Sequence, residues 1–275
     1  VYRTKAYELP EAARDARGQH VANLLPFQPG EEIAQIMALR DYEAAPYLVL
    51  ATREGLVKKS RLEDFDSARS AGINLREGDE LIAARLVFPD DDLLLISSDA
   101  QAIRFPASDE SLRPMGRATS GVIGMRFLEG DYLLSMDVIR PGDGSTDVLV
   151  ATENGYAKRT PAEQYPVQNR GGKGVLTAKV VEARGKLVGA MMVDPEVDEI
   201  FAITSAGGVI RTGAAEIQQS GRTTMGVRLM NLDNGNKIVA VARNAEAAEE
   251  DAVDAEEDSG DTVEDIVAEE GNPQA

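Results

Sequence analysis

The chain has 275 residues, of which 43% are hydrophobic, and it contains no cysteine. It is long enough to bury a sizeable core, and disulfides and thiolate metal sites are excluded. No run of about 18 apolar residues indicates a membrane span and no signal peptide opens the chain, so we expect a cytoplasmic protein with no membrane partner.

The net charge of −18 is concentrated at the carboxy-terminal end of the chain. Residues 244–275 contain 13 acidic residues and no lysine or arginine, whereas residues 1–243 contain 34 acidic and 29 basic residues, a net charge of −5. We therefore predict a folded domain over 1–243 and a disordered acidic tail over 244–275.

The chain opens on a fragment of a repeated unit. Residues 1–4 (Val-Tyr-Arg-Thr) align with residues 157–160 (Ala-Lys-Arg-Thr), the second strand of a hairpin predicted later in the chain. We therefore expect that the first strand and turn of this hairpin precede residue 1, and that the chain is part of a longer protein.

Four copies of a β-hairpin follow, each an apolar run, a short turn and a second run. They cover residues 47–60, 93–105, 147–160 and 199–212. Three of the turns contain glycine, which reaches positive φ without a steric penalty, at Gly55, Gly155 and Gly207. The second hairpin has Ala100 instead, so we expect its turn to differ.

After each hairpin an arginine precedes small residues and a new apolar run. The arginines are Arg17, Arg69, Arg117, Arg170 and Arg222, at intervals of 52, 48, 53 and 52 residues. A period near 50 residues with several strands per unit predicts an all-β, propeller-like disc and disfavours a solenoid. The unit around Arg69 is shorter than the others, which predicts a trimmed loop there.

The repeats align two columns of basic residues. The first column, on the second strand of each hairpin, contains Arg3, Lys59, Arg104, Arg159 and Arg211, with Lys58 and Lys158 beside it; the second column contains the five arginines that set the period. Strand ends that face solvent also favour basic residues, but two full columns around a disc predict a rim that contacts DNA phosphates without reading sequence.

The sharpest motif is Gln168-Asn169-Arg170-Gly171-Gly172-Lys173-Gly174. It lacks the spacing of a nucleotide-binding P-loop. The alternative interpretation of the motif is an ordinary glycine-rich loop without a ligand. Its three glycines (Gly171, Gly172 and Gly174) let the backbone approach a phosphate closely. Arg170 can bind phosphate oxygens in a fork, and Lys173 supplies a point charge.

This motif resembles the gyrase-A box of the carboxy-terminal domain family of DNA gyrase A subunits. The similarity extends over residues 1–243, for example in 9–12 (Leu-Pro-Glu-Ala), 154–160 (Asn-Gly-Tyr-Ala-Lys-Arg-Thr) and 221–227 (Gly-Arg-Thr-Thr-Met-Gly-Val). The resemblance implies a six-bladed β-pinwheel whose blades exchange strands, with an incomplete first blade in this chain. The family's principal box would precede Val1, so the motif at 168–174 is similar to a second box.

The resemblance also implies a function. Such domains bind, bend and wrap duplex DNA without sequence specificity, so that gyrase introduces negative supercoils with a fixed direction. The expected partners are duplex DNA, the rest of the gyrase A dimer and gyrase B in an A2B2 complex on the chromosome. That holoenzyme is an ATP-hydrolysing type IIA topoisomerase, an isomerase; this chain is expected to be non-catalytic and to hold no cofactor, since ATP and Mg²⁺ are used elsewhere.

Two alternatives to a gyrase domain stay open. One is the corresponding domain of topoisomerase IV, which is similar but typically lacks an intact box. The other is a β-propeller that binds proteins, although the absence of tryptophan excludes a WD signature. A propeller enzyme would need converging catalytic groups, and nothing in the sequence nominates them. His20 is the only histidine, so a histidine-based triad elsewhere in the chain and a multi-histidine zinc site are excluded.

Overall fold

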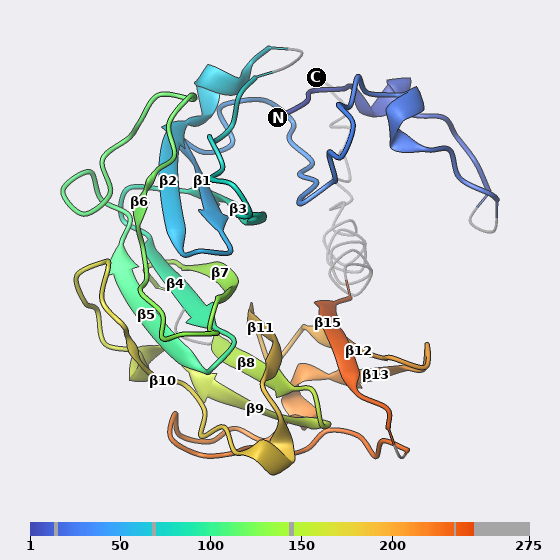
Figure 1. Ribbon diagram of the computed structural model, residues 1–275, viewed down its shortest axis with the longest axis vertical. Coiled ribbons are helices and arrows are strands. Elements are labelled where there is room, and N and C mark those ends of the chain that lie inside the picture. Colours follow the sequence, from blue (N-terminus) through green and yellow to red (C-terminus); the bar gives the residue numbers. More distant parts are fainter. Residues whose placement is uncertain (14–15, 68–69, 143–145, 234, 245–275) are drawn as a thin grey trace, which may run out of the picture.

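The computed structural model describes residues 1–13, 16–67, 70–142, 146–233 and 235–244. These residues form four antiparallel sheets that follow one another around an arc (Figure 1). The all-β, propeller-like class is therefore confirmed. The count of six blades stays a prediction, because the described residues form four sheets. None of the described helices is long and apolar enough to cross a bilayer.

Each four-stranded sheet is built from strands of two repeats, whereas the three-stranded sheet comes from one, and neighbours in the following order are hydrogen-bonded. The first sheet contains β3 (Leu81–Val87), β1 (Tyr47–Thr52), β2 (Leu56–Arg61) and β6 (Val122–Ile123). The second contains β10 (Val175–Leu176), β5 (Gln101–Pro106), β4 (Asp92–Ser97) and β7 (Leu133–Ile139). The third contains β11 (Leu187–Val193), β8 (Asp147–Thr152), β9 (Tyr156–Pro161) and β14 (Val227–Arg228). The fourth contains β13 (Val209–Gly213), β12 (Glu199–Thr204) and β15 (Ile238–Arg243).

The only helices in the described part are single 3-10 turns. They are η1 (Ala6–Glu8), η2 (Val21–Asn23), η3 (Leu62–Phe65), η4 (Ala162–Gln164), η5 (Glu182–Arg184) and η6 (Ala214–Glu216). Three of them, η3, η4 and η6, directly follow the second strand of a hairpin, so this turn is part of the repeat.

The blades exchange strands, as the resemblance implied. β6 follows β5 in the chain but pairs with β2 of the previous sheet; likewise β10 pairs with β5 and β14 with β9. Each four-stranded sheet is therefore completed by the repeat that follows it. The exchanged strands lie on the outer side of the arc, and β3, β7, β11 and β15 lie on the inner side, where neighbours contact one another (Figure 1).

The core lies between the sheets, because β1, β4 and β8, the first strands of the first three hairpins, are buried on both faces. Successive side chains of β4 alternate between two clusters: Leu93 and Leu95 pack toward the first sheet, and Leu94 and Ile96 toward the third. This explains why the hairpins contain continuous apolar runs instead of alternating ones. Residues 1–46 contain no named strand among their described residues, and Met37, Leu39 and Tyr42 pack against the first sheet.

The prediction that Ala100 forms a different turn is wrong. Its φ is +61°, and its N–H donates to the Ser97 carbonyl at 3.1 Å, just as Gly55 donates to Thr52 at 2.9 Å. The left-handed conformation costs a residue with a Cβ roughly 1–2 kcal/mol. The Ala100 methyl group is completely buried in the core between the second and third sheets, which offsets part of that cost.

Candidate nucleic-acid interface

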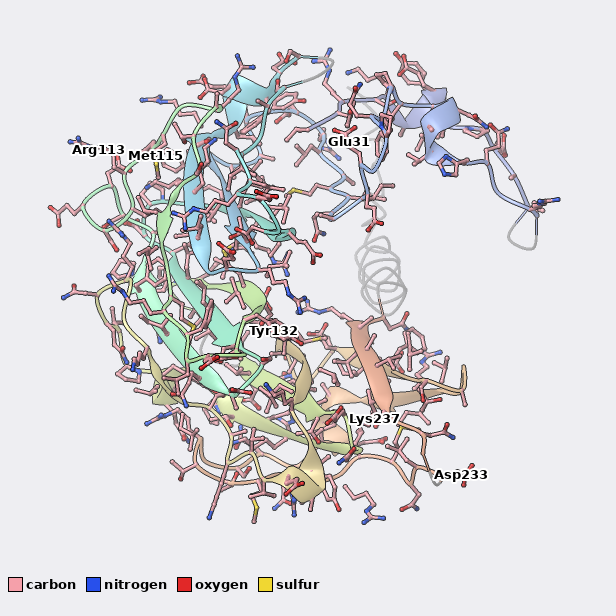
Figure 2. The ribbon with its side chains drawn as sticks, viewed as in Figure 1. Glu31, Arg113, Met115, Tyr132, Asp233 and Lys237 are labelled. Atoms are coloured by element: carbon pink, nitrogen blue, oxygen red, sulfur yellow. The ribbon has the colours of Figure 1, made fainter. Side chains whose placement is uncertain are left out.

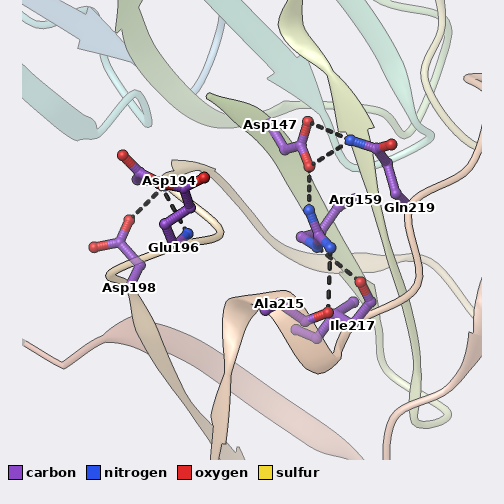
Figure 3. Close-up of polar contacts among 8 residues, drawn as sticks. All are labelled: Asp147, Arg159, Asp194, Glu196, Asp198, Ala215, Ile217 and Gln219. Carbon is purple, nitrogen blue, oxygen red and sulfur yellow. Dashed lines mark hydrogen bonds and ion pairs between the residues drawn. The ribbon is translucent and has the colours of Figure 1, made fainter. Parts of the chain in front are cut away.

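The first basic column joins neighbouring repeats and does not face a ligand. Arg159 donates to the Asp147 carboxylate, to the Ile217 carbonyl at 2.7 Å and to the Ala215 carbonyl at 3.2 Å (Figure 3). Asp147 also accepts two bonds from Gln219. Ala215 lies in the η6 turn of the next repeat and Ile217 directly follows that turn, so Arg159 connects one blade to the following one.

The other members of this column repeat the arrangement. Arg104 pairs with Asp92 at 2.7 Å and reaches the Ala162 and Tyr165 carbonyls at η4. Lys59 donates to the Ala107 carbonyl at 2.6 Å and to Asp109 at 2.7 Å. The remaining pairs are Arg3 with Asp66 and Arg211 with Glu199. The Lys59 and Arg211 bonds lower the pKa of the Asp109 and Glu199 carboxyls.

The prediction that this column contacts DNA is therefore wrong for its buried members. The side chain of Lys59 is 0% exposed and that of Arg159 is 10% exposed, so phosphates cannot reach them. Arg3, Arg104 and Arg211 already have a carboxylate partner, which leaves little net charge for a phosphate. Most members of this column stabilise the contacts between neighbouring repeats, whereas Arg211 pairs within its own hairpin.

Lys58 and Lys158 are also buried, and they support turns that carry second-column arginines. Lys158 donates to the carbonyls of Gly221 and Arg222, both at 2.7 Å, and to the Thr224 hydroxyl at 3.3 Å. Lys58 donates to the carbonyls of Gly72, at 2.6 Å, and Arg117. Burial lowers the pKa of both ammonium groups to about 8. The prediction that these two lysines bind DNA is wrong, because they point into the protein.

We call the segments 117–121, 170–174 and 222–226 the box turns. Each runs from a second-column arginine to the glycine before an exchanged strand, namely Gly121, Gly174 and Gly226. These glycines have φ near +80°, and a Cβ at Gly174 would lie 2.2 Å from the Ala102 carbonyl oxygen. Gly121 and Gly226 meet the Val57 and Ala157 carbonyls in the same way. The repeated Arg-x-x-x-Gly-Val pattern thus reflects a turn pressed against the strand of the previous repeat.

The motif at 168–174 forms the middle box turn. The backbone of Gln168 donates to the Arg104 carbonyl at 2.7 Å, and Gly171 donates to the Gly124 carbonyl at 2.6 Å. Gly172 lies against the Ile103 side chain, which takes the place that Lys58 and Lys158 occupy under the other two box turns. Lys173 is exposed and has no carboxylate partner among the described residues.

The box-turn arginines keep their charge uncompensated. Arg170 donates to the carbonyls of Ser111 at 2.7 Å and Ile123 at 3.2 Å. Arg117 donates to the Asp64 carbonyl at 2.9 Å and the Ser70 hydroxyl at 3.0 Å, and Arg222 to the Leu176 carbonyl at 2.9 Å. Neutral carbonyls orient a guanidinium without neutralising it, so these three arginines present positive charge, in contrast to the first column.

The box turns follow the outer side of the arc, next to β6 and β10 (Figure 1). Arg113, which is exposed, lies on this outer side, close to Met115, whose N–H donates to the Lys59 carbonyl (Figure 2). Of the two remaining second-column members, Arg17 is exposed between η1 and η2, and Arg69 lies outside the described residues.

Sequence reasoning missed three residues that contact the box turns. The backbone N–H groups of Asn74, Arg126 and Lys179 donate to Thr119, Gly172 and Thr224 respectively. The signal was a spacing of nine residues from Arg117 to Arg126 and from Arg170 to Lys179, but only two repeats carry it. Within the described residues, no cluster of histidine or acidic side chains is suited to hold a metal ion.

Comparisons with known proteins agree with this geometry. The A subunit of DNA gyrase from Mycolicibacterium smegmatis is 63% identical over 252 residues, which cover 90% of this chain and 30% of that protein. The chain thus spans less than a third of that relative's length. Among solved structures, a topoisomerase IV C-terminal domain has a TM-score of 0.79 at 26% identity, covering 93% of this chain and 79% of that one. A gyrase A C-terminal domain has a TM-score of 0.73 at 28% identity, covering 87% and 77%.

The two solved structures show that this fold occurs in both kinds of topoisomerase, so the fold alone does not separate them. The sequence relative that is 63% identical to this chain is a gyrase A subunit. A family described as "DNA gyrase C-terminal domain, beta-propeller" matches residues 1–40, 46–87, 91–140, 146–194 and 198–244, one segment for each repeat. The chain belongs to the DNA gyrase C-terminal domain family.

Proposed function

We propose that this chain binds duplex DNA along its outer side and bends it, without reading the base sequence. The observation that carries the proposal is the contrast between the two basic columns. Arg117, Arg170 and Arg222 occupy equivalent places on successive repeats and have only neutral partners in the described structure, whereas the first column is internally neutralised. A regular series of uncompensated arginines on a curved edge suits a regular series of phosphates.

Sequence-independent binding follows from the kind of element that carries these arginines. Base edges are read by helices or strands that enter a groove, and short glycine-containing turns are poorly suited to that. At a curvature like that of the nucleosome, about 45° per 10 bp, a U-turn takes roughly 40 bp. Bending DNA this sharply costs on the order of 10 kcal/mol, so several phosphate contacts must offset it.

In the longer parent protein, we propose that this bending determines the direction of strand passage. The chain would act as the wrapping domain of gyrase A, in an A2B2 complex with gyrase B that introduces negative supercoils into the chromosome in the cytoplasm. ATP, Mg²⁺ and DNA cleavage would belong to other parts of that complex. This chain would bend and position the DNA, and it would not make or break covalent bonds.

The proposal is tested by ligating nicked circular DNA in the presence of the chain and measuring the linking number that remains. The wild type should leave writhe of one sign, and Arg170→Ala with Lys173→Ala should leave less. The matched control is Arg76→Ala with Lys237→Ala, which removes two exposed charges outside the box turns and should behave as wild type. Wild-type protein that leaves the linking number unchanged would overturn the wrapping proposal.

A further inference from the structure

Each box turn is contacted by a residue from the preceding repeat, always in the same way. The N–H of Asn74 donates to the Thr119 carbonyl at 3.0 Å, that of Arg126 to Gly172 at 2.9 Å, and that of Lys179 to Thr224 at 3.0 Å. In all three cases the acceptor is the second residue after a second-column arginine. The three donors are therefore structurally equivalent, although Asn74 comes from the shorter repeat.

This backbone bond fixes each donor's Cα beside the box turn of the next repeat. The side chains differ. Arg126 and Lys179 are exposed and have no carboxylate or carbonyl partner in the described part of the chain, whereas Asn74 donates to the Ala118 carbonyl at 3.0 Å. Two of the three box turns thus have a second, uncompensated cation within their immediate surroundings.

We propose that Arg126 and Lys179 bind DNA phosphates and that each completes the box turn of the following repeat. The middle turn then has Arg170 and Lys173 from its own repeat and Arg126 from the repeat before. The turn at 222–226 has Arg222 from its own repeat and Lys179 from the one before. The inference rests on the proposed function, because it assumes that phosphates pass over the box turns.

The ligand class follows from the chemistry of the site. A guanidinium and an ammonium group with no anionic partner bind phosphate oxygens by charge-assisted hydrogen bonds. Each of them lies beside the box turn of the following repeat, through its backbone bond to Gly172 or Thr224. The turn at 117–121 lacks this cation, because Asn74 takes the equivalent place.

The side chain at the equivalent position differs among the three sites, and this difference suggests the experiment. Arg126→Asn and Lys179→Asn introduce the residue that the first site already accepts, and they keep the backbone donor. We would measure binding of the 275-residue chain to a duplex of roughly 40 bp by fluorescence anisotropy over a range of salt concentrations. Each neutralised phosphate adds about −0.9 to the slope of log affinity against log salt. The double variant should therefore flatten the slope by up to about two units.

Two further variants keep the test decisive. Asn74→Arg should steepen the slope by up to about one unit, since it adds the missing cation, and this gain cannot result from a folding defect. Arg76→Asn removes an exposed charge outside the box turns and should leave the slope unchanged. If Arg170→Ala flattens the slope but neither the double variant nor Asn74→Arg changes it, this inference is wrong and the proposed function stands. Wild-type binding without salt dependence would reject both.

Discussion

Asp147 and Arg159 face each other across the hairpin of β8 and β9, twelve residues apart, with side chains that are 4% and 10% exposed. The same spacing joins Asp92 to Arg104 and Glu199 to Arg211. In the remaining hairpin, Tyr47 takes the place of the acid, and the Lys59 ammonium lies 4.4 Å from the centre of its ring. The first basic column therefore has a partner of its own in every complete hairpin.

Arg159→Gln should destabilise the fold and not primarily alter DNA binding. It leaves the Asp147 carboxylate buried without its cation, which typically costs about 3–5 kcal/mol. Urea unfolding followed by circular dichroism would measure this. Adding Asp147→Leu should restore part of the loss, because it removes the unpaired charge. An Arg159→Gln protein that has wild-type stability but binds DNA more weakly would mean that this column does contact DNA.

Gly174→Ala should destabilise the chain much more than Gly207→Ala. Both glycines have φ near +80°, so both substitutions carry the same backbone strain of roughly 1–2 kcal/mol. Only at residue 174 would the new Cβ collide with a backbone carbonyl, because nothing lies within 4 Å of a Cβ at residue 207. Denaturant unfolding of the two variants should differ by at least about 1 kcal/mol. Equal losses would mean that the middle box turn adjusts freely.

Lys158 gives the stability a specific pH dependence. Burial lowers its pKa in the folded chain from 10.5 to about 8. Between these values the unfolded chain holds a proton that the folded chain has released, so the free energy of unfolding rises with pH, by up to about 1.4 kcal/mol per unit. Below pH 8 the lysine is charged in both states, and above 10.5 it is neutral in both.

Lys158→Met isolates this contribution. The free energy of unfolding of the wild type minus that of the variant should increase from pH 8 to 10.5. At pH about 7 the variant should also bind DNA more weakly, because the Gly221 and Arg222 carbonyls lose the donor that positions this box turn. A difference that falls over that pH range would contradict the buried position of the ammonium group.

The acidic segment should weaken DNA binding. Asn244 is buried and donates through its backbone and side chain to Glu199, so it belongs with the last sheet and not with the predicted tail. Residues 245–275 lie outside the described residues and contain all 13 acids of that segment. Truncation after Asn244 should tighten binding most at about 0.01 M salt, where charges act over roughly 30 Å. Equal affinity at that ionic strength would leave the segment without this role.

The sequence predicted the period, the hairpins and the middle box turn, because these depend on local signals: apolar runs, glycine spacing and repeated arginines. It did not predict that Lys58 and Lys59, adjacent on one strand and facing opposite ways, are both buried. Their burial results from packing between residues far apart in the chain. Lys59 lies under residues 107–109, and Lys58 lies under the box turn at 117–121. The acid or tyrosine twelve residues before the first-column base of each complete hairpin was the available signal.

The second basic column, and not the first, is the one that we expect to contact DNA. The most direct test is the salt dependence of duplex binding for two sets of variants. Alanine at Arg117, Arg170 and Arg222 should flatten the slope of log affinity against log salt by up to about three units. Alanine at Arg3 and Arg211, which are partly exposed but paired with carboxylates, should leave that slope within about half a unit of wild type. If the slope changed with the Arg3 and Arg211 variants and not with the Arg117, Arg170 and Arg222 variants, this assignment would be contradicted.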